Sequence, residues 1–186
     1  MTAAAKTPQT KKKARPKKPG SLRSAVAELH DLRPLHVPEH ATLVVAWVEI
    51  PGDNTQRTQH WAAKRTWQDV VKNHFAASVE VQPHPGILAN PQVHIQLHVR
   101  RAGDSANSYG RAKYVIDRLQ RRRVITANVG GKVQERVYGM LDLIEDDKDL
   151  TMGKNLTIEE VHARVSADAN GCKVLIWVWE EKGFEW

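Results

Sequence analysis

Hydrophobic and polar residues alternate between Gln92 and Arg100, with apolar residues at the odd positions from Val93 to Val99. A repeat of this kind predicts a β-strand with one buried face and one polar face. His94 and His98 fall on the polar side, and we expect them to be exposed. A zinc site is disfavoured because the chain offers no third ligand at a recognisable spacing.

Two longer segments have apolar residues at three- and four-residue steps, which predicts amphipathic helices. The first runs from about Thr58 to Val79. The second begins after Asp104 and ends near Arg123. Its residues Tyr109, Ala112, Ile116 and Leu119 are predicted to face the core of the protein. Its last turn is rich in arginine, which either complements the helix dipole or contacts phosphate. These arginines are Arg118, Arg121, Arg122 and Arg123.

The remaining pattern predicts further strands joined by turns. Residues 42–50 read as the first core strand, and Pro51 to Asn54 have turn chemistry. Residues 124–141 predict two short strands around a turn at residues 128–131. Residues 155–165 and 173–180 are predicted to form a closing hairpin through a turn at residues 168–171.

Residues 173–180 are apolar on both faces, so this strand requires cover on both sides. Trp177 or Trp179 is therefore a candidate dimer contact. Together the elements predict an α/β or α+β fold, a small mixed β-sheet with two main helices packed on it.

Charge divides the chain into parts. Residues 1–23 hold eight basic residues and no acidic one, whereas the rest holds 20 basic and 21 acidic residues. We expect residues 1–23 to be a disordered basic tail that binds nucleic acid through Lys11, Lys12 and Lys13, or a solubilising tail. Residues 24–41 are predicted to be a linker with a short helix, and residues 42–182 a single domain.

The chain has one cysteine, Cys172, so an intrachain disulfide is excluded. No run of residues is apolar enough to predict a membrane span or a secretion signal. We expect a soluble, intracellular, cytoplasmic protein.

The densest candidate chemistry lies at Asp104 to Leu119 and at Glu145 to Asp147. If Asp104, Asp146 and Asp147 meet, their repulsion favours a bound cation, and carboxylate oxygens suit hard ions such as Mg²⁺. Lys113 and Asp117 lie four residues apart on one helix face. They are either a solvated helix pair or part of that site.

This segment resembles the signature of RusA-type Holliday junction resolvases, in which Asp-x-Asp-Asn opens a helix, a Lys and Asp-x-Leu follow, and a second loop ends in Asp-Asp. The matching residues are Asp104, Asn107, Lys113, Asp117, Leu119, Asp146 and Asp147. Residues 48–51 with Asn54 resemble the family's opening strand and loop. The resemblance covers roughly residues 43–180. It departs from the signature at Ala106, which stands where the second Asp of the motif belongs.

The resemblance implies a RusA-like nuclease domain at residues 42–182 and a Mg²⁺-dependent endonuclease, with Mn²⁺ as a possible substitute, that resolves four-way DNA junctions. Asp104, Lys113 and Asp147 would be catalytic, and Asp104, Asp146 and Asp147 would bind the metal. Asn107 and Asp117 would support them, with Asp117 orienting Lys113 or water. DNA contacts would come from Arg100, Arg101, Asn54 and Arg57. The family acts as homodimers on branched DNA, so a two-fold dimer is implied.

Ala106 leaves two alternatives open. The first is a junction-binding protein on the same fold that does not cut DNA. The second is an unrelated nucleic-acid-binding or scaffold protein whose affinity resides in the basic tail.

Overall fold

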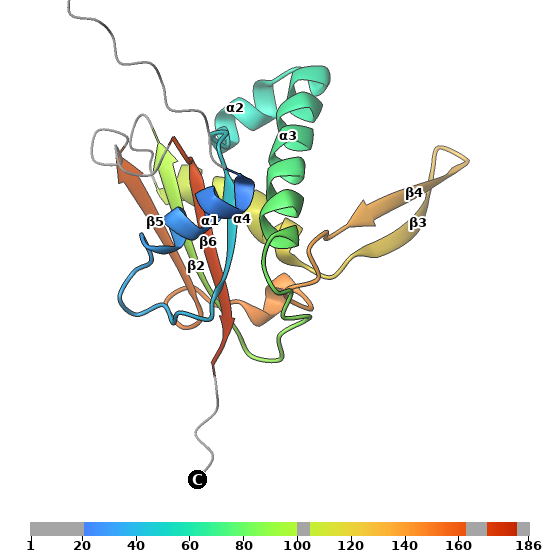
Figure 1. Ribbon diagram of the computed structural model, residues 1–186. Helices are drawn as coiled ribbons and strands as arrows, with labels where there is room; N and C mark the ends of the chain where they lie inside the picture. Colours follow the sequence, from blue (N-terminus) through green and yellow to red (C-terminus); the bar gives the residue numbers. More distant parts are fainter. Residues whose placement is uncertain (1–20, 100–104, 163–170, 182–186) are drawn as a thin grey trace, which may run out of the picture.

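The computed structural model describes residues 21–99, 105–162 and 171–181 (Figure 1). Its helices are α1 (Leu22–His30), α2 (Asp53–Thr58), α3 (Trp61–Glu80), α4 (Ser105–Leu119) and the short 3-10 helix η1 (Asp147–Asp149). Its strands are β1 (Thr42–Ala46), β2 (Pro91–Val99), β3 (Arg123–Val129), β4 (Lys132–Tyr138), β5 (Leu156–His162) and β6 (Val174–Glu180).

Four strands form a mixed sheet in the order β1-β6-β2-β5. Strand β6 is antiparallel to both β1 and β2, whereas β5 is parallel to β2. Helices α3 and α4 contribute to the core on one face of this sheet. The predicted mixed α/β fold with two main helices on a small sheet is therefore confirmed.

Strand β6 lies inside the sheet, so the predicted closing hairpin is wrong. Strands β5 and β6 are not neighbours, because β2 lies between them. A strand with apolar side chains on both faces leaves least apolar surface exposed in the middle of a sheet covered on both sides. Ile176 joins the core under α3 and α4, and Trp177 joins a second core on the opposite face.

The second core is closed by α1, which lies across the sheet face opposite α3 and α4 (Figure 1). Val26 and Leu29 of α1 pack with Val37 and Trp177, and all four side chains are buried. Trp177 is fully buried and cannot form the predicted dimer contact, whereas Trp179 is half-buried and stays a candidate. Residues 22–41 supply the cover that the apolar pattern of β6 required.

Helix α3 satisfies the free edge of β1. Side chains four residues apart, two on the helix and one just after its C-cap, accept hydrogen bonds from alternate backbone N–H groups of the strand and its extension. These bonds are Leu43 N to Gln82 Oε1 at 3.1 Å, Val45 N to Ser78 Oγ at 3.2 Å and Trp47 N to His74 Nδ1 at 3.3 Å. An edge strand with paired N–H groups cannot recruit a further strand there.

Strand β1 ends at Ala46, opposite Val174, short of the predicted end at Ile50.

His94 and His98 are buried, with 3% and 5% of their surface exposed, so their predicted exposure was wrong. Strand β2 lies between β6 and β5, and the segment after α1 brings His36 onto its polar face. The Nε2 atom of His36 lies 3.2 Å from Nδ1 of His94. Neither ring nitrogen of His98 has a hydrogen-bond partner in the described part of the chain.

Helix α4 ends at Leu119, four residues before its predicted end. The segment at residues 140–144 supplies backbone donors to the last carbonyl groups of the helix. Met140 N donates to Gln120 O, Leu141 N to Arg118 O and Leu143 N to Leu119 O, each at 3.0 Å. These bonds cap the helix at Leu119. Of the four arginines predicted for its last turn, only Arg118 lies there, and Arg123 begins β3.

The predicted hairpin at residues 124–141 is confirmed as β3 and β4, which form their own two-stranded sheet. Gly130 and Gly131 form its turn, both with positive φ. The hairpin projects from the body of the molecule (Figure 1). Gly139, at its base, also has a positive φ, and an added Cβ would lie 2.1 Å from Arg121 O. Only glycine fits this junction.

None of the described helices combines the length and the apolar character needed to cross a lipid bilayer.

The buried histidines make a prediction about pH. Burial lowers the pKa of His98 from 6.5, Lys173 lowers it further and Glu159 opposes the shift. Burial also lowers the pKa of His94. Below about pH 6.5 the unfolded chain takes up protons that the folded chain does not, so this contribution to stability is complete above that pH and is lost as the pH falls.

We expect the thermal midpoint to fall as the pH is lowered below about 6.5. His98→Leu should flatten that dependence without loss of stability at neutral pH, because it removes buried nitrogens that have no partner in the described structure. Thermal unfolding followed by circular dichroism across this range measures both effects. His40→Leu, at an exposed histidine, is the control. Equal pH slopes for His98→Leu and the wild type would contradict the assignment.

Candidate functional site

Lys113 joins residues from two distant parts of the chain. Its Nζ atom lies 2.9 Å from Oδ1 of Asp117, one turn further along α4. It also donates to Oδ2 of Asp147, which is 34 residues away in the sequence. All three side chains are partly exposed, at 42%, 45% and 30%. Lys113 thus joins Asp117 to the acidic loop, whereas the predicted approach of Asp104 falls outside the described residues.

A buried ion pair fixes the part of α4 that carries Lys113. Arg111 Nη1 lies 2.7 Å from Glu160 Oε1 of β5, and both side chains are largely buried. Arg111 Nε also donates to Ile50 O at 3.0 Å. These contacts hold the helix against β5 and against the segment between β1 and α2, so Lys113 has a defined position.

The acidic loop is anchored by its apolar neighbours. Leu143 and Ile144 are fully buried, and Ile144 forms isolated bridges to Leu88 and Gln120. Asp146 then caps η1, accepting a hydrogen bond from Lys148 N at 3.3 Å. The buried residues before the loop therefore fix the position at which Asp147 contacts Lys113.

Electrostatics keep this cluster charged. Partial burial of the ammonium acts to lower the pKa of Lys113, but hydrogen bonds with Asp147 and Asp117 outweigh it and raise the pKa to about 12. The pKa of Asp146 is lowered, first by a hydrogen bond with Asp147 and then by the Lys148 N–H, with Arg123 adding to the effect. At neutral pH the cluster presents an ammonium flanked by carboxylates.

Two clefts meet at this cluster. One, of about 600 Å³, is lined by Gln56, Arg57, Lys64, Gln68, Tyr109, Gly110, Lys113, Tyr114, Asp117 and Arg118. The other, of about 460 Å³, is lined by Lys113, Asp117, Arg118, Gln120, Val137, Tyr138, Gly139 and Asp147. Lys113, Asp117 and Arg118 form the wall common to both clefts.

Arg118 presents cationic surface to both clefts. Its guanidinium carbon lies 4.9 Å from the centre of the Tyr114 ring, a cation-π contact. Its Nε atom is buried and has no hydrogen-bond partner in the described structure. With Arg57 and Lys64, it makes the larger cleft predominantly cationic.

Of the predicted DNA contacts in the described residues, Arg57 lines the larger cleft and Asn54 does not. Asn54 lies exposed on α2, where its carbonyl accepts a hydrogen bond from Thr58 Oγ1. The other predicted residues, Asp104, Arg100, Arg101, Lys11, Lys12 and Lys13, lie outside the described residues. Asn107 and Ala106 belong to the first turn of α4, and their side chains are likewise outside the described part.

The described carboxylates do not by themselves fit a Mg²⁺ ion. Asp146 Oδ2 lies 3.3 Å from Arg123 Nη1, and Asp147 contacts Lys113, so each carboxylate already faces a cation. No group of three His, Cys, Asp or Glu side chains able to hold a metal occurs within residues 21–99, 105–162 and 171–181. Hard divalent ions require more oxygen ligands than two carboxylates that already face cations provide.

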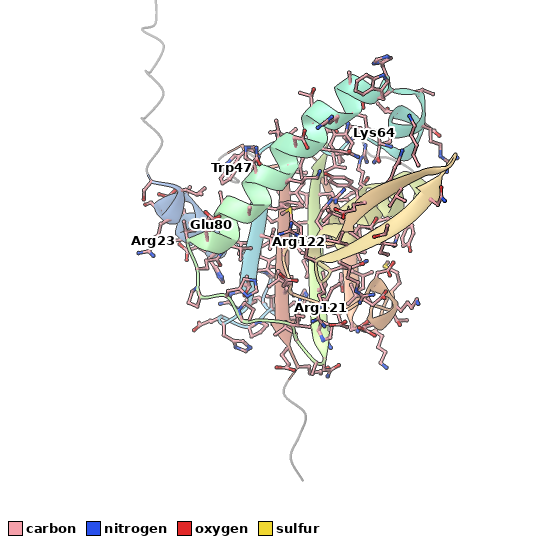
Figure 2. The ribbon with its side chains drawn as sticks, turned by 90° about the vertical axis from the view of Figure 1, so that its right-hand side faces the viewer. Arg23, Trp47, Lys64, Glu80, Arg121 and Arg122 are labelled. Atoms are coloured by element: carbon pink, nitrogen blue, oxygen red, sulfur yellow. The ribbon has the colours of Figure 1, made fainter. Side chains whose placement is uncertain are left out.

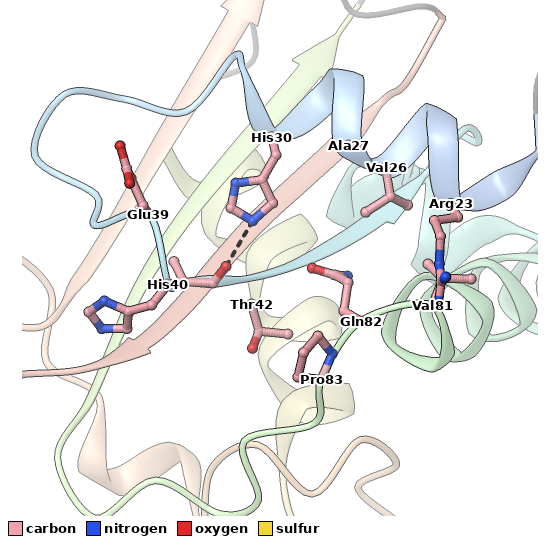
Figure 3. Close-up of a pocket in the computed structure, with 11 residues that line it drawn as sticks. Arg23, Val26, Ala27, His30, Glu39, His40, Thr42, Val81, Gln82 and Pro83 are labelled. Carbon is pink, nitrogen blue, oxygen red and sulfur yellow. Dashed lines mark hydrogen bonds between the residues drawn. The ribbon is translucent and has the colours of Figure 1, made fainter.

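A separate cavity of about 600 Å³ lies under α1, on the opposite side of the sheet (Figure 3). Its lining is mostly apolar and includes Val26, Ala27 and Val81. At its edge His30 Nε2 lies 2.9 Å from Ala41 O. None of the predicted site residues lines this cavity.

The sequence interpretation missed Lys64 and misplaced Tyr109. Tyr109 was predicted to face the core, yet 52% of its surface is exposed. Ala112, Ile116 and Leu119 are buried as predicted, whereas Tyr109 lines the larger cleft together with residues of α2 and α3. Lys64 carried no motif, and only the packing of α2, α3 and α4 brings it to the cleft.

The fold and the site thus define a mixed α/β protein with a lysine and two aspartates where two clefts meet, the larger of them predominantly cationic. Comparison of the chain with protein-family models, with curated proteins and with solved structures found no match.

The Lys113–Asp147 contact makes a prediction about stability. In a double-mutant cycle with Lys113→Met and Asp147→Asn, the two residues should couple favourably by about 1 kcal/mol or less, because solvent screens partly exposed pairs. Urea unfolding measures this coupling. It should persist from about pH 7 to about pH 9, where the ammonium stays charged, and should weaken in concentrated salt.

The matched control is Lys72 with Asp69, a partly exposed pair three residues apart on one helix at 3.4 Å. Such helix pairs contribute a few tenths of a kcal/mol. Coupling at Lys113 and Asp147 that does not exceed the control would contradict a defined contact between α4 and the acidic loop.

Proposed function

We propose that this protein binds branched DNA and that Lys113 and Arg118 hold backbone phosphates where the two clefts meet. The observation that carries the proposal is the wall shared by both clefts, where two cations of α4, Lys113 and Arg118, line both of them. A guanidinium can donate two parallel hydrogen bonds to phosphate oxygens, and an ammonium adds a compact charge.

The surroundings of this wall also suit a nucleic acid. Arg57 and Lys64 extend the cationic lining along the larger cleft. Tyr109, exposed in the same cleft, offers an aromatic face on which an unpaired base can stack. Asp117 and Asp147 restrain the Lys113 ammonium, so a phosphate can bind it in only some orientations.

The resemblance to RusA-type resolvases supports a branched substrate for the same site. Lys113, Asp117 and Asp147 all correspond to positions of the family's signature, and the lysine contacts both aspartates. A four-way junction has two-fold symmetry, so a homodimer is part of the proposal.

Binding is tested with a fluorescent four-way junction and a linear duplex of equal length, in the presence of a chelator. We expect tighter binding to the junction. Lys113→Ala should weaken it about tenfold or more, a loss of about 1.4 kcal/mol, because Asp117 and Asp147 then repel the phosphate. Lys154→Ala is the control, since Lys154 is exposed and lines neither cleft.

Wild-type affinity in Lys113→Ala, together with loss of affinity when residues 1–20 are removed, would contradict this site. It would place binding in the basic tail, as the unrelated nucleic-acid-binding alternative requires.

The second candidate function is metal-dependent cleavage of the bound junction. It is favoured by the contact of Asp147 with Lys113 and by the neighbouring carboxylate of Asp146. Since the described carboxylates do not complete a Mg²⁺ site, cleavage would need Asp104, as the resemblance implies. Lys113 would then steady a phosphate oxygen and Asp117 would hold the lysine in place.

Cleavage is tested by incubating labelled junction and duplex with Mg²⁺, with Mn²⁺ or with chelator. Ala106→Asp should increase paired nicking of the junction, because it restores the carboxylate that the signature contains. Asp147→Asn in that background should abolish it. Tight binding without nicking in either protein would favour the junction-binding alternative, and equal nicking of duplex would point to a less selective nuclease.

A further inference from the structure

The β3–β4 hairpin, here called the arm (residues 121–138), concentrates the positive charge of the folded chain. Five basic residues and one acidic residue lie in the arm, whereas the rest of the chain after residue 23 has 15 basic and 20 acidic residues. The arm is therefore cationic on a body that is otherwise acidic.

The charge of the arm is arranged by its register. Residues opposite one another in an antiparallel pair belong to the same face of the ribbon. By this pairing, Arg123, Lys132 and Arg136 occupy positions on one face of the ribbon. Val124, Val133 and Glu135 occupy positions on the other face. All of the strand cations thus fall on one side.

Two cations of the arm are available to a ligand. Arg122 and Lys132 have exposed side chains, and no ion pair is found for either among the described residues. Arg121 and Arg123 differ, because they pair with Glu145 at 3.4 Å and 3.2 Å. Figure 2 views the molecule from the side on which the arm projects, with Arg121 and Arg122 near its base.

Several apolar side chains of the arm are exposed. Val124, Ile125, Val133 and Val137 are each about half exposed or more, at 55%, 49%, 72% and 53%. An isolated two-stranded hairpin is only marginally stable in water. A partner that packs along the ribbon would stabilise it.

Resting on the function proposed above, we propose that the arm lies in the major groove of a duplex branch of the DNA. It would lead that branch to the smaller of the two clefts that Lys113 lines. The major groove is wide enough for a two-stranded β-ribbon. Strands of seven residues span about 23 Å, roughly two thirds of a helical turn of DNA. Val137, Tyr138 and Gly139 at the base of the arm also line this smaller cleft.

Charge favours DNA over a second copy of the chain as the occupant of the arm. Pairing of two arms about a two-fold axis would bring two cationic ribbons together, and like charges in an interface oppose association. A polyanion is complementary to the same surface, and its counterions are released on binding.

The test compares two double variants of the full chain. Arg122→Gln with Lys132→Gln removes the two cations of the arm that have no ion pair in the described structure, and Val124→Thr with Val133→Thr is the matched change on the other face. Affinity for a four-way junction, a linear duplex and a single strand is measured over a range of salt concentrations. Circular dichroism and light scattering monitor folding and molecular mass.

We expect the glutamine variant to bind junction and duplex more weakly. The slope of log affinity against log salt should fall by about 2, because each of the two cations neutralises one phosphate in the wild-type complex. Its affinity for the single strand should change less, because that ligand has no groove. The threonine variant should keep the wild-type slope.

An unchanged slope in the glutamine variant would overturn the arm proposal, while loss of affinity in Lys113→Ala would leave the proposed function standing. A threonine variant that turns dimer into monomer, with DNA binding unchanged in the glutamine variant, would assign the arm to a second copy. If the wild-type protein binds none of these DNAs, both proposals fail.

Discussion

The structure depends on the burial of β6 on both faces. Its apolar side chains point alternately into two cores, so the strand is stable only between β1 and β2 with helices on each side. That constraint places α1 over Trp177 and α3 and α4 over Ile176. It also leaves β1 at an edge, where N–H groups of β1 and of Trp47 donate to Ser78 and His74 of α3 and to Gln82 just after that helix.

The same arrangement creates the candidate site. Helix α4 is held by the Arg111–Glu160 ion pair, and its C-terminal carbonyls accept the backbone donors of residues 140–143. The segment that caps the helix is continuous with the acidic loop, so one set of backbone bonds sets the distance between Lys113 and Asp147. A partly exposed ion cluster gains little stability from its own charges. Its geometry is therefore imposed by the buried elements beside it.

Charge is separated over the molecule in a way that suits a polyanion. The arm is cationic and the two clefts share cations on α4, while the carboxylates near them are paired with Lys113 and Arg123. A ligand rich in phosphate would meet cations along the arm and then at the cleft, with Val137 and Tyr138 as the connection. This arrangement connects the arm proposal with the function proposed for Lys113.

Local pattern was enough to predict the elements whose residues act on near neighbours. Alternation at residues 92–100, helical spacing from Thr58 and the glycines of the β3–β4 turn all correspond to observed elements, because side-chain period and turn conformation are local properties. The contact of Lys113 with Asp117 also follows from one helical turn. The contact of Lys113 with Asp147 was predicted only by resemblance. Tertiary structure alone decided which strands are neighbours, why His94 and His98 are buried, where α4 ends and which cations share a cleft. Each of these depends on contacts between segments distant in the sequence, and the free energy of burying β6 outweighs the local preference for a closing hairpin.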